Sequence, residues 1–213
     1  ARGFDPGDPY SRAVEDSALP DRFRFGVPRA EDLRFFGDEA AAQLFADAVE
    51  RLSGLGGQAV TIDFTPFRET ADLLYSGPWV AERMAAVETF LRDRPESVHP
   101  VTRRIIQSAD RYSAVDAFRA MYRLEELRGA AGRAWREIDV LLVPTAGTIY
   151  TVDQLEADPV ALNTNLGAYT NFTNLLDLSA IALPNGFGPL GLPLGVTLIA
   201  PAGRDRALAA LGS

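Results

Sequence analysis

The sequence contains no cysteine, no lysine and a single histidine, His99. The missing cysteine excludes disulfides, thiolate metal sites and cysteine nucleophiles. One histidine makes a multi-histidine metal site impossible and disfavours a Ser-His-Asp triad. The missing lysine excludes Schiff-base chemistry, P-loop phosphate binding and any Ser-Lys mechanism carried within this chain. Self-contained nucleophilic catalysis is therefore not expected.

Acidic residues outnumber basic ones. The 21 basic residues are all arginines, against 29 aspartates and glutamates, so the formal charge is −8. An acidic chain lacks the positive surface typical of proteins that bind nucleic acid or anionic membranes. No apolar run approaches the roughly 20 residues of a transmembrane helix, and Ala1-Arg2-Gly3 does not open a signal peptide. We therefore expect a cytoplasmic protein with no nucleic-acid or membrane partner.

Strand and helix patterns alternate along the chain, which is typical of an α/β fold. Five apolar or alternating segments predict strands at 23–27, 58–64, 138–143, 179–183 and 196–200. Helical spacing covers residues 38–53 and most of 68–137. Breaks are expected near Gly77-Pro78 and around Pro95 and Pro100, because proline and glycine interrupt helices.

The sequence predicts one α/β body, residues 23–213, preceded by an extended lead-in. Residues 1–22 form this lead-in because they are rich in Asp, Pro and Gly. The chain starts at Ala1 without an initiator methionine, and residues 204–211 resemble the opening of a helix that is cut short. We therefore expect a chain truncated at both ends.

Residues 75–83 contain a candidate anion pocket. Ser76-Gly77-Pro78 suits a helix start, with a cap at Ser76 or Gly77 and Pro78 at the first helical position. Arg83 would lean back toward that end, with Tyr75 just outside it. A helix amino terminus favours anions, and an arginine fork matches a carboxylate. The alternative is structural: Tyr75 and Trp79 pack in the core while Arg83 pairs with a nearby acid.

Three other features allow a structural or a functional interpretation. Thr145 follows an apolar strand, where ligands of α/β folds gather, but an ordinary strand exit explains it equally well. Residues 163–174 concentrate amides and hydroxyls, which must be hydrogen-bonded if buried, and this favours loop bracing over ligand contact. His99 lies between helices and is interpreted as a surface or capping residue.

Two segments carry a family resemblance. Residues 141–146 (LLVPTA) and 171–186 (NFTNLLDLSAIALPNG) resemble the carboxy-terminal half of the amidase signature family. Within that family, Phe4-Asp5-Pro6 to Ser11, residues 75–83 and residues 167–178 are most similar to the allophanate hydrolases. The resemblance implies a mixed β-sheet flanked by helices. It also implies that this chain is the carboxy-terminal portion of one amidase domain.

The resemblance further implies a site and a reaction. Tyr75 and Arg83 match the residues that bind the substrate, allophanate, which is a small planar anionic amide; Thr145 is a weaker candidate for the pocket wall. A Ser-Ser-Lys triad upstream of Ala1 would hydrolyse allophanate to ammonia and carbon dioxide, as part of nitrogen metabolism by urea or triazine degradation. No metal or organic cofactor is implied.

The partners and two alternative functions remain open at this point. The implied partners are the missing amino-terminal half of the amidase domain and the anionic amide, and a homodimer is left open. One alternative function is a catalytically inactive α/β remnant. The other is one chain of a split amidase that acts on other small amides.

Because the triad is expected outside this sequence, we predict that the purified 213-residue chain releases no ammonia from small amides. An ammonia assay on allophanate and on neutral amides checks this. Ammonia release that a serine-directed inhibitor abolishes would contradict it.

Overall fold

The computed structural model describes residues 4–13 and 18–213, apart from the side chains of Tyr75 and Ser76. The strands are β1 (Phe23–Pro28), β2 (Gly57–Ile62), β3 (Val140–Pro144), β4 (Leu178–Phe187) and β5 (Pro193–Pro201). The helices are α1 (Glu39–Gly54), α2 (Thr65–Ser76), α3 (Trp79–Asp93), α4 (Pro100–Gln107), α5 (Ala114–Ala134), α6 (Val152–Ala157), α7 (Ala161–Leu166), α8 (Phe172–Leu175) and α9 (Asp205–Leu211). Each of the five segments predicted as a strand overlaps one of these strands, although 58–64 runs two residues past β2 and 138–143 begins two residues before β3.

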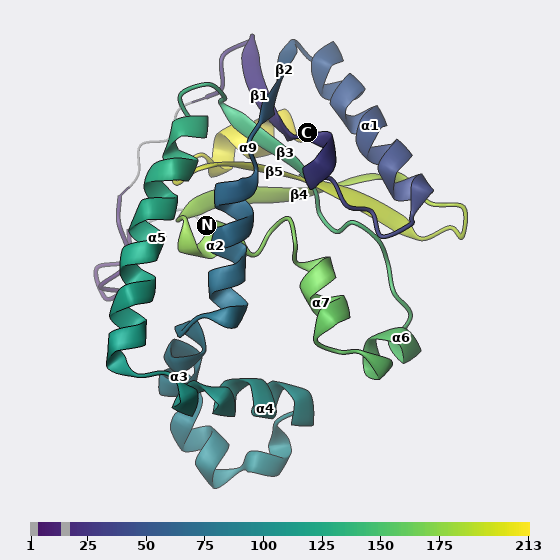
Figure 1. Cartoon of the computed structure of the whole chain (residues 1–213). Helices are drawn as coiled ribbons and strands as arrows, with labels where there is room; N and C mark the ends of the chain where they lie inside the picture. The colour runs from purple at the N-terminus through teal and green to yellow at the C-terminus, as the bar shows by residue number, and fades with distance from the viewer. Residues whose placement is uncertain (1–3, 14–17) are drawn as a thin grey trace.

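The strands form one mixed sheet in the order β2-β1-β3-β5-β4 (Figure 1). β1 pairs in parallel with both β2 and β3. β5 runs antiparallel to β3 and to β4. Parallel neighbours need a crossover connection, and α1 supplies the one from β1 to β2. The mixed sheet flanked by helices is therefore confirmed.

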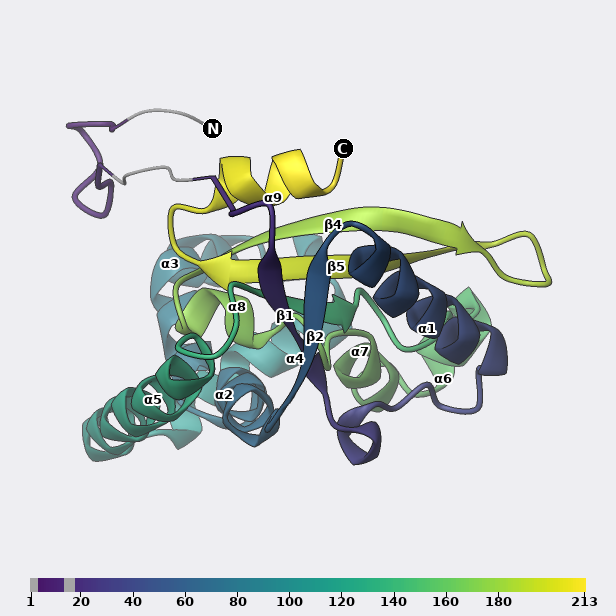
Figure 2. The same cartoon turned by 90° about the horizontal axis from the view of Figure 1, so that it is seen from above.

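β3 lies at the centre of the sheet, and all of its residues are buried. Leu141 and Val143 belong to a core that includes residues of α2, α5 and α8. Val140 and Leu142 belong to a second core, with residues of α1 and α9. In Figure 2, α9 lies on the opposite side of β4 and β5 from α2 and α5. Side chains alternate between the faces of a strand, so the uninterrupted apolar run of β3 supplies both cores.

The helical region breaks at Gly77-Pro78, as predicted. However, Pro78 occupies the N-cap position of α3 and Trp79 is its first residue, so the predicted cap at Ser76 or Gly77 is wrong. Gly77 instead ends α2, where a Cβ would lie 2.4 Å from the Leu73 carbonyl oxygen. The tight end of α2 therefore requires glycine at this position.

α3, α4 and the amino-terminal half of α5 extend away from the sheet (Figure 1). α5 begins with a capping box in which Ser113 and Asp116 bond each other's backbone N–H groups. Its second half is buried through Leu124 and Leu127, whereas Phe118 in the first half is exposed. α3, α4 and the amino-terminal half of α5 are therefore attached to the rest of the structure through α2 and the carboxy-terminal half of α5.

The structure describes part of the predicted lead-in and the whole carboxy-terminal segment. Residues 4–13 and 18–22 contain no helix or strand, and Arg12 forms an ion pair with Asp177. The division of the chain into a lead-in and a body stays a prediction. Residues 1–3 and 14–17 lie outside the described residues. α9 confirms the helix predicted at 204–211. None of the helices described is both long and apolar enough to cross a membrane.

We predict that Phe172→Ala lowers the free energy of unfolding by about 3–5 kcal/mol, because it opens a cavity in the core. Phe172 is 0% exposed, and its ring centroid lies 5.1 Å from that of Phe67 and 5.6 Å from that of Phe64. Urea denaturation measures the change. Phe118→Ala is the matched control, since Phe118 is 56% exposed. Equal losses in the two variants would contradict the assignment of Phe172 to the core.

Candidate functional site

Tyr75 and Arg83 lie on either side of the Gly77-Pro78 break. Tyr75 is in the last turn of α2, but its side chain lies outside the described residues. Arg83 is in the second turn of α3, and it is half-buried. The carboxy terminus of α2 and the amino terminus of α3 therefore follow one another directly in the chain, as predicted from the spacing of these residues. Their roles stay predictions.

Thr145 directly follows β3 and is fixed by the sheet. Its N–H donates to the Gly195 carbonyl at 3.0 Å, and its hydroxyl lies 2.9 Å from the Thr197 hydroxyl. A little further on, Thr148 donates to Asp38, the N-cap residue of α1, at 3.2 Å. The strand exit is thus held by hydrogen bonds to β5 and to the start of α1. Thr145 does not line the hollow described next, so its role as a pocket wall stays a prediction.

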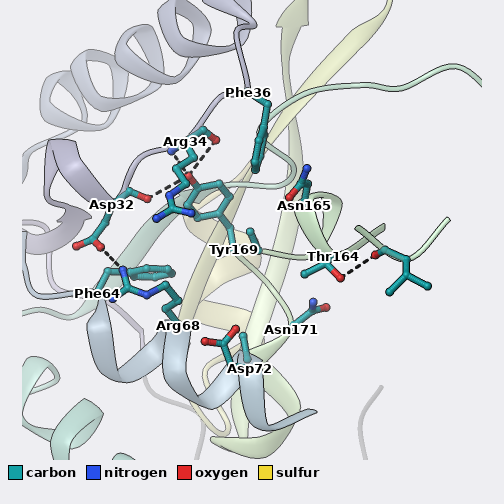
Figure 3. Close-up of a pocket in the computed structure, with 13 residues that line it drawn as sticks. Asp32, Arg34, Phe36, Phe64, Arg68, Asp72, Thr164, Asn165, Tyr169 and Asn171 are labelled. Carbon is teal, nitrogen blue, oxygen red and sulfur yellow. Dashed lines mark hydrogen bonds and ion pairs between the residues drawn. The ribbon is translucent and has the colours of Figure 1, made fainter. Parts of the chain in front are cut away.

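A hollow of about 430 Å³ lies between α2, α7 and the segment before α1 (Figure 3); we call it the α2–α7 hollow. Asp32 and Arg34 line it from the segment before α1, and Arg68 and Asp72 line it from α2. From α7 and the segment after it come Thr164, Asn165, Tyr169 and Asn171. The hollow therefore offers charged groups of both signs together with amides and hydroxyls.

An ion pair joins the two walls at one end of the hollow (Figure 3). Arg68 Nη1 lies 2.6 Å from Asp32 Oδ1, and the Asp32 side chain is only 7% exposed. Loss of the Arg68 partner would leave this largely buried carboxylate unpaired, which is destabilising. The pair thus holds α2 against the segment before α1, and it fixes Arg68 in the wall.

Tyr169 connects the segment after α7 to the segment before α1. Its hydroxyl accepts from the Arg34 N–H and lies 3.1 Å from the Arg34 carbonyl and 3.2 Å from the Asp32 carbonyl (Figure 3). The residue is 2% exposed, and burial raises the pKa of its phenol, while hydrogen bonding to Arg34 opposes the rise. The neutral phenol is therefore the form that the folded protein favours.

The polar run 163–174 both braces the structure and lines the hollow. Asn165 donates to the Tyr150 hydroxyl at 3.0 Å, and Tyr169 makes the contacts above. Asn165 and Asn171 also line the hollow, so the run braces the loops beside it, and a ligand contact stays untested. His99 is exposed at the N-cap position of α4 and makes no side-chain cap bond, which confirms a surface histidine.

The charged residues of the hollow were not predicted from the sequence. Arg68, Asp72 and Tyr75 are spaced by four and three residues on α2, and this spacing puts their positions on one helix face. That periodicity was visible in the sequence, although nothing in it showed which way the face points. Asp32 and Arg34 come from an irregular segment with no pattern of its own.

No metal site is evident in the described part of the chain. Within it, no group of three or more His, Cys, Asp or Glu side chains lies close enough to hold a metal ion. The polar groups of the hollow are better suited to a small polar organic molecule, because guanidinium groups bind carboxylates and carboxylates accept from amide N–H groups.

Solved structures with this fold are amidase-signature enzymes. An allophanate hydrolase from Kluyveromyces lactis superposes with a TM-score of 0.92 at 35% identity, over 97% of this chain and 34% of that one. A 6-aminohexanoate cyclic dimer hydrolase shares the fold at a TM-score of 0.76 and 20% identity, over 99% of this chain and 49% of that one. The α/β fold is thus that of the amidase-signature enzymes.

Sequence comparison leads to the same family. The model of the Amidase family matches residues 5–209, so the chain belongs to the amidase family. A urea amidolyase from Saccharomyces cerevisiae is 40% identical over 210 residues, which cover 97% of this chain and 11% of that protein. The chain therefore spans only a small part of the relative that it matches.

We predict that Tyr169→Phe lowers the free energy of unfolding by about 1–3 kcal/mol at neutral pH, because a partly buried N–H loses its acceptor. The pKa of the Tyr169 phenol is raised by folding. Its stabilisation is therefore complete below the ordinary pKa of about 10 and is lost as the pH rises through the folded value. Denaturation at several pH values should show the two proteins converging above about pH 10. A difference that stays constant would contradict this account.

Proposed function

We propose that the chain is the carboxy-terminal portion of an amidase domain of the allophanate hydrolase type, and that it forms the substrate pocket. The observation that carries this proposal is the α2–α7 hollow, whose α2 wall continues along the helix face to the position of Tyr75. The likeness to allophanate hydrolase at a TM-score of 0.92 supports this type.

Arg83 is proposed to bind the substrate carboxylate and Tyr75 to orient the substrate beside it. A guanidinium fork forms two parallel hydrogen bonds with a carboxylate, and these bonds are stronger than those between neutral groups. Arg83 lies within the first two turns of α3, where the helix dipole also favours an anion. Allophanate carries one carboxylate and one terminal amide. A pocket with a cationic end and a polar uncharged end would therefore complement it.

Thr145 is proposed as part of the pocket wall. The Thr145–Thr197 hydroxyl pair is half-buried at the end of β3, and ligands of α/β folds gather at strand ends. Each hydroxyl of this pair keeps a lone pair for a further donor. The role depends on the rest of the amidase domain, which would close the pocket over this end of the sheet.

The reaction proposed is the hydrolysis of allophanate to ammonia and carbon dioxide. A serine of a Ser-Ser-Lys triad outside this chain attacks the terminal amide carbon, ammonia leaves, and water then releases the acyl group from the serine. The released carboxylated product breaks down to ammonia and carbon dioxide. The part of this chain is to hold the carboxylate end so that the amide carbon faces the nucleophile.

The partner that this function requires is the rest of the amidase domain, which would carry the triad. We also propose a place in cytoplasmic nitrogen metabolism, since the likeness to urea amidolyase supports a role in urea degradation.

In a complete amidase that contains this chain, we predict that Arg83→Ala lowers kcat/KM for allophanate about 10- to 100-fold. Loss of a hydrogen bond to a charged group costs about 1.5–3 kcal/mol, which corresponds to this range. Biuret is the matched neutral substrate, because it carries an amide where allophanate has its carboxylate. Its kcat/KM should change less than about threefold, since no charge-assisted bond is lost.

The control variant is Arg92→Ala. Arg92 lies on the same helix, is exposed and pairs with the adjacent Asp93 at 3.1 Å. In this variant, kcat/KM for allophanate and kcat/KM for biuret should therefore both stay at their original values. An equal loss for allophanate and biuret in Arg83→Ala would show that Arg83 does not bind the carboxylate.

A further inference from the structure

A second hollow continues the first along α7. It measures about 580 Å³ and lies between α7, α4 and the 3-10 turn η3 (Ser108–Arg111). Val160 and Thr164 line both hollows, and the Thr164 hydroxyl donates to the Val160 carbonyl at 2.8 Å. The two hollows therefore adjoin at Val160 and Thr164, and we call the pair the α7 groove. It runs from α4 to the α2 face that carries the proposed substrate site.

The charge of the α7 groove is opposite to that of the chain. Its charged lining residues are Arg34, Arg68, Arg104, Arg111, Asp32 and Asp72. Asp32 is already neutralised by Arg68. At the α4 end the only charged lining residues are Arg104 and Arg111. Positive charge in this groove is notable because the chain as a whole has a formal charge of −8.

The two arginines at the α4 end keep donors for an approaching anion. Arg111 Nε makes one long bond, 3.4 Å, to the Ser108 carbonyl, and the Arg104 residue is exposed. Across the described part of the chain, neither guanidinium has a carboxylate within ion-pair distance. Asp110 adjoins Arg111 in η3 but does not line the groove. A guanidinium has five N–H donors, so most of them face solvent here.

We propose that the α7 groove is the access path of a small carboxylate anion, and that Arg104 and Arg111 steer the anion toward the α2–α7 hollow. This inference rests on the proposed function, which supplies the anionic amide. Only positive charge lines the α4 end of the groove. A surface lined with charge of one sign raises the local concentration of oppositely charged solutes and their association rate by about 10- to 1000-fold. Because the two arginines are exposed, salt screens their effect over about 8 Å at physiological ionic strength.

Steering differs from a short-range binding contact in how the loss of kcat/KM depends on salt and on the charge of the substrate. Arg104 and Arg111 act before the anion reaches the reacting groups, so their removal lowers kcat/KM and leaves kcat unchanged. The loss should be large at low salt and vanish at high salt. It should also be confined to anionic substrates, since a neutral amide does not respond to the field.

The test uses the double variant Arg104→Gln/Arg111→Gln in the complete amidase. At about 0.01 M ionic strength, where the Debye length is about 30 Å, we expect kcat/KM for allophanate to fall about fivefold or more. At about 1 M salt the variant and the parent should agree within about twofold. kcat, and kcat/KM for biuret, should be unchanged at both salt concentrations.

Arg119→Gln is the control, because Arg119 is an exposed arginine of α5 that lies outside the α7 groove and near Asp116. It removes one positive charge and should leave the salt dependence of kcat/KM almost unchanged. A double variant with no loss at low salt would overturn the proposal. So would a loss that persists at high salt, or one that is equal for biuret.

Different experiments test the role of the groove and the proposed function. If the complete amidase does not hydrolyse allophanate, the proposed function is wrong. The association rate constant of oxamate, an anionic amide, then tests the groove directly by stopped-flow mixing, with neutral oxamide as its control. A lower association rate constant for oxamate at low salt in the double variant would support an anion path, and an unchanged one would overturn it.

Discussion

The burial of β3 on both faces is the constraint on which the rest of the structure depends. Its alternating residues supply two separate cores, one under α2, α5 and α8 and the other under α1 and α9. Asp139, directly before β3, forms two hydrogen bonds with Arg24 of β1. The Arg24 N–H donates to the Asp139 carboxylate at 2.7 Å, and the Asp139 N–H donates to the Arg24 carbonyl at 2.8 Å. The end of β3 determines where Thr145 and the strand exit lie. Helices on either face are therefore positioned relative to one strand.

An aromatic cluster connects the core beneath the sheet to the α2–α7 hollow. Phe64 and Phe67 at the start of α2 pack against Phe172 of α8, and Phe64 also contacts Tyr169. Tyr169 in turn holds the Arg34 backbone through its hydroxyl. The apolar cluster and the polar contacts above it thus fix three segments that are far apart in the sequence. The same aromatic packing that builds the core therefore positions the walls of the hollow.

The strands and the helix break could be predicted from the sequence, whereas most of the hollow could not. β3 is an uninterrupted apolar run between helix and proline, and Gly77-Pro78 interrupts a helical pattern, so both have strong local signals. The Arg68–Asp32 pair has none, because its partners are 36 residues apart and meet only when α2 packs on the sheet. Tyr75 and Arg83 were found through a resemblance and a helix-terminus argument, and their substrate roles remain predictions.

The central claim is that the ends of α2 and α3, together with the α2–α7 hollow, form the pocket for an anionic amide. A crystal structure of the complete amidase domain with bound oxamate tests it most directly. We expect the oxamate carboxylate within hydrogen-bond distance of the Arg83 guanidinium, with its amide directed to the serine nucleophile. Oxamate bound away from Arg83 and outside the hollow, in a domain whose triad is complete, would contradict the claim.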